Sequence, residues 1–99
     1  MSHAPLSPTS RVRRRSDVLF APINEDVLAL DETSGQCYSL NEVAGQLWQW
    51  IETPQSIEAL CARLQEGYEV EPDRCVREVQ TVLESLREVG LVEVEPDAA

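Results

Sequence analysis

The sequence contains no lysine, and its only histidine, His3, lies near the start of the chain. Without lysine there is no amine to form a Schiff base and none to hold a phosphate group. Without a histidine in the body of the chain, a serine or cysteine nucleophile has no imidazole base beside it. A glycine-rich phosphate loop is also missing. We therefore predict that the chain is not an enzyme and needs no cofactor.

Cysteines are few, and they do not form the pattern of a metal site. Cys37, Cys61 and Cys75 include no Cys-x-x-Cys pair, whereas a structural zinc site takes four ligands at close spacing. No metal is predicted. An odd number of thiols without an export signal is typical of the cytoplasm, which is the predicted location. No apolar run reaches the length of a membrane span, so no membrane partner is predicted.

Positive charges are scarce and unevenly distributed. The chain has 8 arginines against 18 acidic residues, and four of the arginines lie in residues 1–16, which contain no acid. Residues 17–99 therefore carry a net charge of −14. Such a surface repels phosphates, so nucleic acid is not a predicted partner. Residues 1–16 are also rich in serine and proline, and we predict a flexible basic tail there, followed by one domain over residues 17–95.

Three short apolar runs predict β-strands, at residues 18–20, 27–30 and 37–40. The turn-rich segment between the second and third runs is typical of a hairpin, because Gly35 can adopt a positive φ. The third strand is then one edge of a small antiparallel sheet.

Apolar residues three and four apart predict three helices after the strands. Asn41 and Ser56 are suitable N-caps for the first two helices, and Pro72 suits the first turn of the third, which ends before Gly90. Residues 91–94 are predicted to form a short extended segment. This order predicts an α+β fold of the winged helix-turn-helix type, with a three-stranded antiparallel sheet followed by three helices.

A DNA-binding regulator is one function that this fold would suit. The third helix would then enter the major groove. However, its charged residues are three arginines and four acids, a balance that meets phosphates poorly. The basic tail could add affinity for DNA but could not read bases.

Peptide binding is the function that the edge strand favours. An exposed third strand offers unpaired N–H and C=O groups, which an incoming peptide can pair with as an added strand. The third helix is a candidate second wall, since Cys75, Val82 and Val89 form an apolar stripe beside its core face. That stripe can equally well be buried. Arg74 and Arg77 are candidate partners for acidic side chains of a peptide.

Trp48 and Trp50 cannot both face the core, because they lie two residues apart on a helix. Trp48 falls on the apolar stripe of the first helix. Trp50 is therefore predicted to be half exposed and is a candidate docking residue for a partner protein.

The ordered succession of these motifs resembles the PqqD-like family of recognition elements for ribosomally made, post-translationally modified peptides. The resemblance covers roughly residues 17–95 and is carried by Val27-Leu28-Ala29-Leu30-Asp31, by Ser34-Gly35-Gln36-Cys37-Tyr38-Ser39-Leu40-Asn41-Glu42-Val43-Ala44, by Leu47-Trp48 and by Gly90-Leu91-Val92.

The resemblance implies that the domain binds the leader of a precursor peptide and presents it to a modifying enzyme. The leader would lie as an antiparallel strand against the third strand and pack on the third helix. The residues that this implies for the two walls are Gln36, Cys37, Tyr38 and Ser39 on the strand, and Arg74, Cys75, Glu78, Thr81 and Val82 on the helix.

Two kinds of partner enzyme stay open within the family. The Gly-x-x-Tyr-x-Leu-Asn and Leu-Trp segments look more like the stand-alone elements of lasso-peptide pathways, which serve a leader peptidase and a cyclase. The alternative is the pyrroloquinoline-quinone type, which serves a radical-SAM enzyme.

Overall fold

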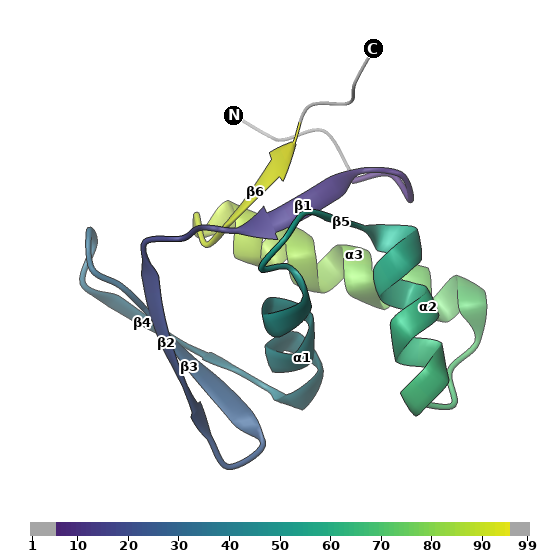
Figure 1. Cartoon of the computed structure of the whole chain (residues 1–99), viewed down its shortest axis with the longest axis horizontal. Helices are drawn as coiled ribbons and strands as arrows, with labels where there is room; N and C mark the ends of the chain where they lie inside the picture. The colour runs from purple at the N-terminus through teal and green to yellow at the C-terminus, as the bar shows by residue number, and fades with distance from the viewer. Residues whose placement is uncertain (1–5, 96–99) are drawn as a thin grey trace.

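A computed structural model of the chain describes residues 6–95. Two small antiparallel sheets and three helices pack around one core (Figure 1). This confirms the predicted α+β fold class. The predicted sheet is present as β2 (Val18–Ile23), β3 (Asp26–Asp31) and β4 (Gln36–Leu40), joined in that order. Gly35 has the expected positive φ, 75°, in the β3–β4 turn.

The three helices lie close to their predicted positions. They are α1 (Glu42–Trp50), α2 (Ile57–Gly67) and α3 (Pro72–Glu88). The side chain of Asn41 accepts a hydrogen bond from the backbone N–H of Ala44, and Ser56 does the same for Ala59, so both predicted N-caps are confirmed.

The second sheet was not predicted. It consists of β1 (Arg11–Arg14) between β5 (Gln55–Ser56) and β6 (Val92–Glu95), and β6 is the predicted C-terminal extended segment. The flexible tail predicted for residues 1–16 is therefore wrong over β1. Val12 is fully buried there, and Leu6 is also part of the core. Residues 1–5 of the predicted tail lie outside the described residues.

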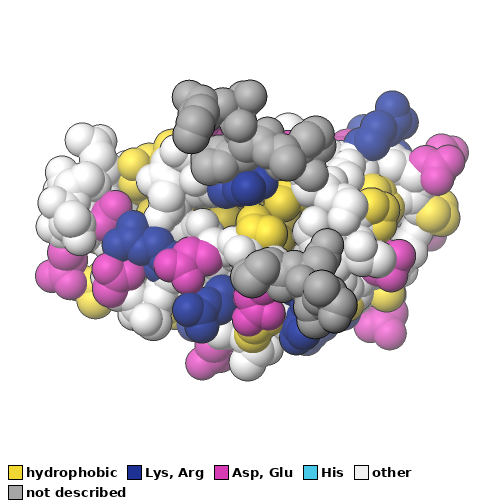
Figure 2. Space-filling model, turned by 90° about the horizontal axis from the view of Figure 1, so that it is seen from above, with side chains coloured by type: hydrophobic (Ala, Val, Ile, Leu, Met, Phe, Trp, Pro, Cys, Tyr) yellow, Lys and Arg dark blue, Asp and Glu magenta, His cyan; other side chains and the backbone are white. Residues whose placement is uncertain are grey.

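Two of the three arginines of β1 have acidic partners on β6. Arg13 lies 3.2 Å from Glu93, and Arg11 lies 4.0 Å from Glu95. On the face of the molecule seen in Figure 2, arginine and acidic side chains lie next to one another. Pairing with β6 therefore explains why a basic segment becomes a strand in this acidic protein.

The core lies between α1 and the inner face of the β2–β3–β4 sheet, and continues to α2, α3 and β1. Its largest fully buried side chain is Trp48, so the predicted inward position of this tryptophan is confirmed. The α1 helix packs very closely on β3, since a Cβ built on Gly45 would lie 2.8 Å from Val27 Cγ2. None of the helices in residues 6–95 is long and apolar enough to cross a membrane.

Candidate functional site: a groove between β4 and α3

The site is built on the free edge of β4. Within the described residues, β4 pairs with β3 on one side only, and its other edge has no strand beside it. The opposite edge of the sheet is β2, where Pro22 has no N–H to donate. Of the two edges, β4 therefore offers the more complete row of donors and acceptors for an added strand.

A hollow of about 480 Å³ runs between β4 and the second half of α3. On the helix side, Val82 and Val89 supply apolar surface, and Thr81 and Ser85 supply hydroxyl groups. The strand side is formed by Cys37, Tyr38, Ser39 and Leu40. Tyr38 is half buried here, whereas Cys37 and Ser39 are exposed. The walls thus combine an open backbone edge with an apolar helix flank.

A second hollow of about 540 Å³ continues past the end of β4 toward the start of α3. Its walls are Asn41 and Val43 on one side and Arg74, Arg77 and Glu78 on the other. The two hollows share Asn41, Thr81 and Val82, so they form one continuous depression. We call it the β4–α3 groove.

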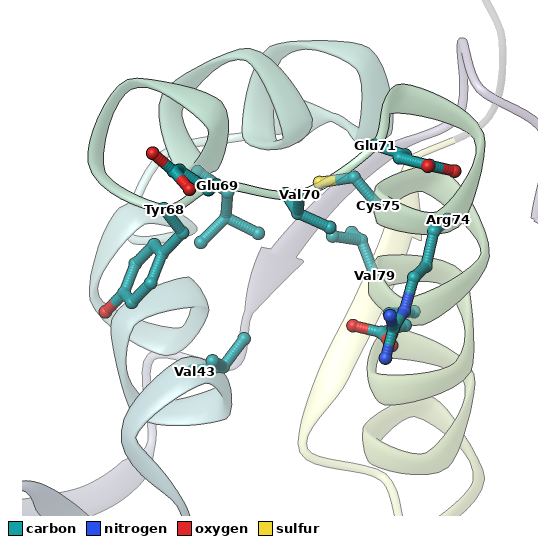
Figure 3. A pocket seen from close by; sticks show the side chains of 10 residues that line it. Val43, Tyr68, Glu69, Val70, Glu71, Arg74, Cys75 and Val79 are labelled. Carbon is teal, nitrogen blue, oxygen red and sulfur yellow. The ribbon is translucent and has the colours of Figure 1, made fainter.

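A third hollow, of about 440 Å³, adjoins the groove near the start of α3 and shares Val43, Arg74 and Glu78 with it. Figure 3 shows Val43 of α1, Tyr68 and Val70 of the α2–α3 loop, and Cys75 and Val79 of α3 around it, and Leu64 of α2 also lines it. Its lining is mainly apolar, with acidic groups at Glu69, Glu71 and Glu78.

Polar contacts fix the rim of this third hollow. The Tyr68 hydroxyl donates a hydrogen bond to Glu42 Oε1 at 3.2 Å, and this contact raises the pKa of the tyrosine. Arg74 Nε donates to Glu78 Oε1 at 3.0 Å, one turn further along α3. Both partners of that ion pair are more than half exposed, so it can open to meet a ligand at little cost.

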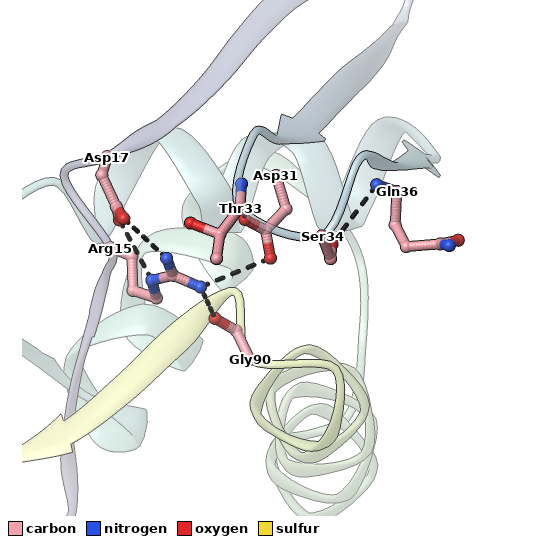
Figure 4. Close-up of polar contacts among 7 residues, drawn as sticks. All are labelled: Arg15, Asp17, Asp31, Thr33, Ser34, Gln36 and Gly90. Carbon is pink, nitrogen blue, oxygen red and sulfur yellow. Dashed lines mark hydrogen bonds and ion pairs between the residues drawn. The ribbon is translucent and has the colours of Figure 1, made fainter.

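Arg15, which follows β1, links the sheet that carries β4 to the end of α3. Its guanidinium donates to the carbonyl oxygen of Gly90, just after α3, at 2.8 Å. The same nitrogen lies 3.5 Å from Asp31 Oδ2 at the end of β3 (Figure 4). A paired contact with Asp17 holds the guanidinium in place, raising the pKa of Arg15 and lowering that of Asp17. This arginine therefore bridges the end of β3 and the end of α3.

Most of the residues predicted for the peptide site come together in the groove. Those that line it are Cys37, Tyr38, Ser39, Arg74, Glu78, Thr81 and Val82. Gln36, at the start of β4, lines neither of its two hollows. Cys75 is 98% buried, lines only the third hollow, and donates a weak hydrogen bond to the Cys61 carbonyl oxygen at 3.9 Å. A binding role for these residues stays a prediction.

Several residues that line the groove were absent from the predicted walls, and three of these lie at the start of α1. Asn41 was seen only as a helix cap, and Val43 and Ala44 only as core residues of α1. Val43 is in fact 37% exposed. The spacing of apolar residues along α1 predicts which face of the helix is buried. It does not predict which residues lie at the margin of that face, where the groove begins.

Trp50 lies elsewhere and lines neither hollow of the groove. Its ring is half buried, as predicted, and the guanidinium of Arg63 stacks over it at 4.5 Å. Its role in docking a partner is untested. Among residues 6–95, no three His, Cys, Asp or Glu side chains gather as a metal site.

Known proteins share this architecture. The family model described as Coenzyme PQQ synthesis protein D (PqqD) matches residues 18–92. The chain belongs to the PqqD family. The predicted resemblance is therefore confirmed, and the match extends from β2 to the first residue of β6. No curated protein matches the chain.

Three solved structures show the same PqqD-family fold. A lasso peptide synthetase B1 complexed with its leader peptide is 27% identical, with a TM-score of 0.74, and the alignment covers 83% of this chain and 96% of that one. TbiB1 in complex with the TbiA(beta) leader peptide is 22% identical, with a TM-score of 0.77, covering 86% and 99%. The PqqD part of Methylobacterium extorquens PqqCD, a stand-alone recognition element solved by NMR, is 13% identical, with a TM-score of 0.75, covering 89% and 94%.

Proposed function

We propose that this PqqD-family protein binds the leader of a ribosomally made precursor peptide and presents it to a modifying enzyme. The observation that carries the proposal is the free edge of β4 beside the apolar flank of α3. A leader added to β4 as an antiparallel strand satisfies the open backbone groups. Alternate side chains of the leader then point into the groove, where Val82 and Val89 provide apolar contacts.

The direction of the added strand follows from β4. Because β4 runs from Gln36 to Leu40, an antiparallel leader has its N-terminal part near Val43 and Arg74. Its C-terminal part leaves near Val89. The core peptide, which follows the leader, therefore emerges at the Val89 end of the groove, next in sequence to Gly90, whose carbonyl oxygen accepts from Arg15.

The protein itself supplies no chemistry in this proposal. Binding the leader raises the effective concentration of the attached core peptide at the active site of the enzyme. The leader loses conformational freedom on binding, so contacts in the groove must repay that cost. The proposed enzyme is the leader peptidase, and then the cyclase, of a lasso-peptide pathway. The structure with 27% identity, a lasso peptide synthetase B1 bound to its leader, supports this choice.

The alternative partner is the radical-SAM enzyme of a pyrroloquinoline-quinone pathway, in line with the description of the family model. Both alternatives use the same groove and differ in the peptide and in the enzyme that modifies it. We propose the cytoplasm, where precursor peptides are made, as the location.

The test is a fluorescence-polarisation titration with labelled leader peptides encoded beside the gene. A set of leaders carries one backbone N-methyl group each, at successive positions along the binding segment. Only alternate N–H groups of an added strand face β4, so methylation should weaken binding at every second position, by about 2- to 10-fold per lost hydrogen bond. A uniform or absent effect would contradict strand addition.

Matched variants locate the binding surface. Val82→Asp places a charge in the apolar flank of the groove and should abolish leader binding. Ala62→Asp places the same charge on the exposed surface of α2 and should leave it unchanged. A titration with duplex DNA distinguishes peptide binding from the hypothesis of a DNA-binding regulator. Saturable binding to DNA without binding to any leader would overturn the proposed function.

A further inference from the structure

The sheet that provides β4 has a second face, which meets the groove only along β4, where Cys37 and Ser39 line both. Strand pairing aligns Phe20, Ala29 and Tyr38 in one row, and these side chains point toward α1. Phe20 packs edge-on against Trp48 of α1, with ring centroids 5.9 Å apart. The residues that come before and after Phe20, Ala29 and Tyr38 on each strand therefore point to the opposite side of the sheet. Figure 1 shows no helix covering that side.

That opposite side is apolar. Two cross-strand rows cover it: Leu19, Leu30 and Cys37 in one, Ala21, Leu28 and Ser39 in the other. Ile23, paired with Asp26, extends the surface along β2. Leu19 and Ile23 are about half exposed, at 53% and 49%, and Leu28 is 36% exposed. We call this surface the outer sheet face. Contiguous exposed apolar side chains of this kind are typical of an interaction site.

The rim of the outer sheet face is acidic. Residues 17–40 contain no arginine or lysine and five acids, of which Asp17 and Asp31 are paired with Arg15. Glu25 and Asp26 lie exposed at one end of the sheet, and Glu32 lies exposed in the turn at the other end. A second copy of this chain placed face to face would bring these acids together, so the charge pattern disfavours self-association. It favours a partner whose apolar surface has a basic rim.

The outer sheet face is continuous with the proposed peptide site. A leader added to the edge of β4 would extend both rows, since every second side chain would lie beside Cys37 or Ser39 on the outer side. The side chains between them would enter the groove. One surface would thus combine side chains of the protein and of its bound peptide.

We infer that the outer sheet face is the docking surface for the modifying enzyme, a protein with an apolar patch and a basic rim, and that the bound leader completes this surface. The inference rests on the proposed function. It places the enzyme on the sheet side of the molecule and leaves α3 in contact with the leader alone. It also predicts that the enzyme binds the loaded protein more tightly than the empty one.

The test measures the affinity of the purified leader peptidase encoded beside the gene for this protein saturated with leader, by biolayer interferometry. Leu19→Arg combined with Ile23→Arg should weaken this affinity by at least about tenfold, because a hot-spot surface becomes charged with the same sign as the partner. Ala62→Arg, an exposed change on α2, should alter it less than about twofold. Asp26→Arg should weaken it and flatten its dependence on salt.

Leader affinity is measured for every variant by fluorescence polarisation and should match the wild type. If the double variant loses leader binding, each single variant is used in its place. Wild-type peptidase affinity in a variant that still binds leader would overturn the inference. So would a loss caused by Trp50→Ala alone, or a wild-type dimer that the double variant dissociates without changing peptidase affinity. Failure of the proposed function looks different, since the wild type itself would not bind any leader.

Discussion

The guanidinium of Arg15 donates a hydrogen bond to the carbonyl oxygen of Gly90 at 2.8 Å, and so joins the segment before β2 to the end of α3. The same group lies 3.5 Å from Asp31 at the end of β3. One polar group of the sheet and one at the end of α3 therefore meet at one side chain, although neither group lines the β4–α3 groove. This side chain, which belongs to neither wall, ties the sheet that carries β4 to the end of α3.

Replacing Arg15 with glutamine should weaken leader binding by about tenfold, because the walls are no longer held at a fixed distance. Arg13→Gln is the matched control, since the contact of Arg13 with Glu93 is exposed on both sides and lies away from the groove. Titration with labelled leader measures both. Equal affinities of the two variants would show that Arg15 does not position the walls.

Gly45→Ala should destabilise the fold by about 1–3 kcal/mol, because the added methyl group would lie 2.8 Å from Val27 Cγ2. The sign is opposite to the usual gain when alanine replaces glycine in a helix. Gly67→Ala is the control on α2, where a Cβ meets no atom within 4 Å, and it should stabilise by about 0.4–1 kcal/mol. Urea denaturation followed by tryptophan fluorescence measures both changes. Stabilisation by both substitutions would mean that α1 and β3 can move apart freely.

Arg74→Glu should weaken the binding of an acidic leader several-fold at low salt and much less at high salt. The substitution replaces an exposed cation with a carboxylate, which repels the acidic side chains of the leader. Glu78→Gln should act in the opposite direction, since it frees the Arg74 guanidinium from its present acceptor. Affinities at two salt concentrations test both substitutions. A neutral leader should bind both variants equally, and an unchanged affinity for an acidic leader would remove Arg74 from the site.

A thiol reagent should label one of the three cysteines in the folded protein at pH 8. Cys37 is exposed, whereas Cys61 and Cys75 are buried. Burial, together with the neighbouring Cys75 thiol, raises the pKa of Cys61 to about 12, so it stays a neutral, unreactive thiol across the usable pH range. Cys37→Ser should abolish rapid labelling, and bound leader should slow the labelling of Cys37 in the wild type. Mass spectrometry of the labelled peptides measures both. Fast labelling of Cys61 would contradict the packing of α2 on α3.

The sequence predicted those parts of the fold whose signals are local. The strands β2 to β4 and the helices have their own apolar patterns and caps, such as Asn41 and Ser56. The strand β1 has only one fully buried residue, Val12, between arginines. Its main partner is β6, about eighty residues away, and no local pattern reports such a pairing.

The candidate site was predicted in the same uneven way. The edge strand and the outer flank of α3 were found, because strand order and helix periodicity place them. Cys75 was assigned to the same apolar stripe of α3 as Val82, but α2 covers Cys75. Helix periodicity does not predict which neighbouring element packs over each end of such a stripe. The start of α1 was missed, since Val43 has the spacing of a core residue.

The shortness of β4 limits how much of a peptide this protein can distinguish. β4 has five residues, and strand geometry directs about two or three side chains of an equally long partner toward α3. A motif of two or three side chains, distinguished mainly by whether each is apolar, recurs in many unrelated sequences. This protein should therefore bind the same leader motif when it precedes an unrelated core peptide, so the leader can be transferred between precursor peptides. The accuracy of the pathway then rests on the enzyme that reads the loaded complex rather than on the groove.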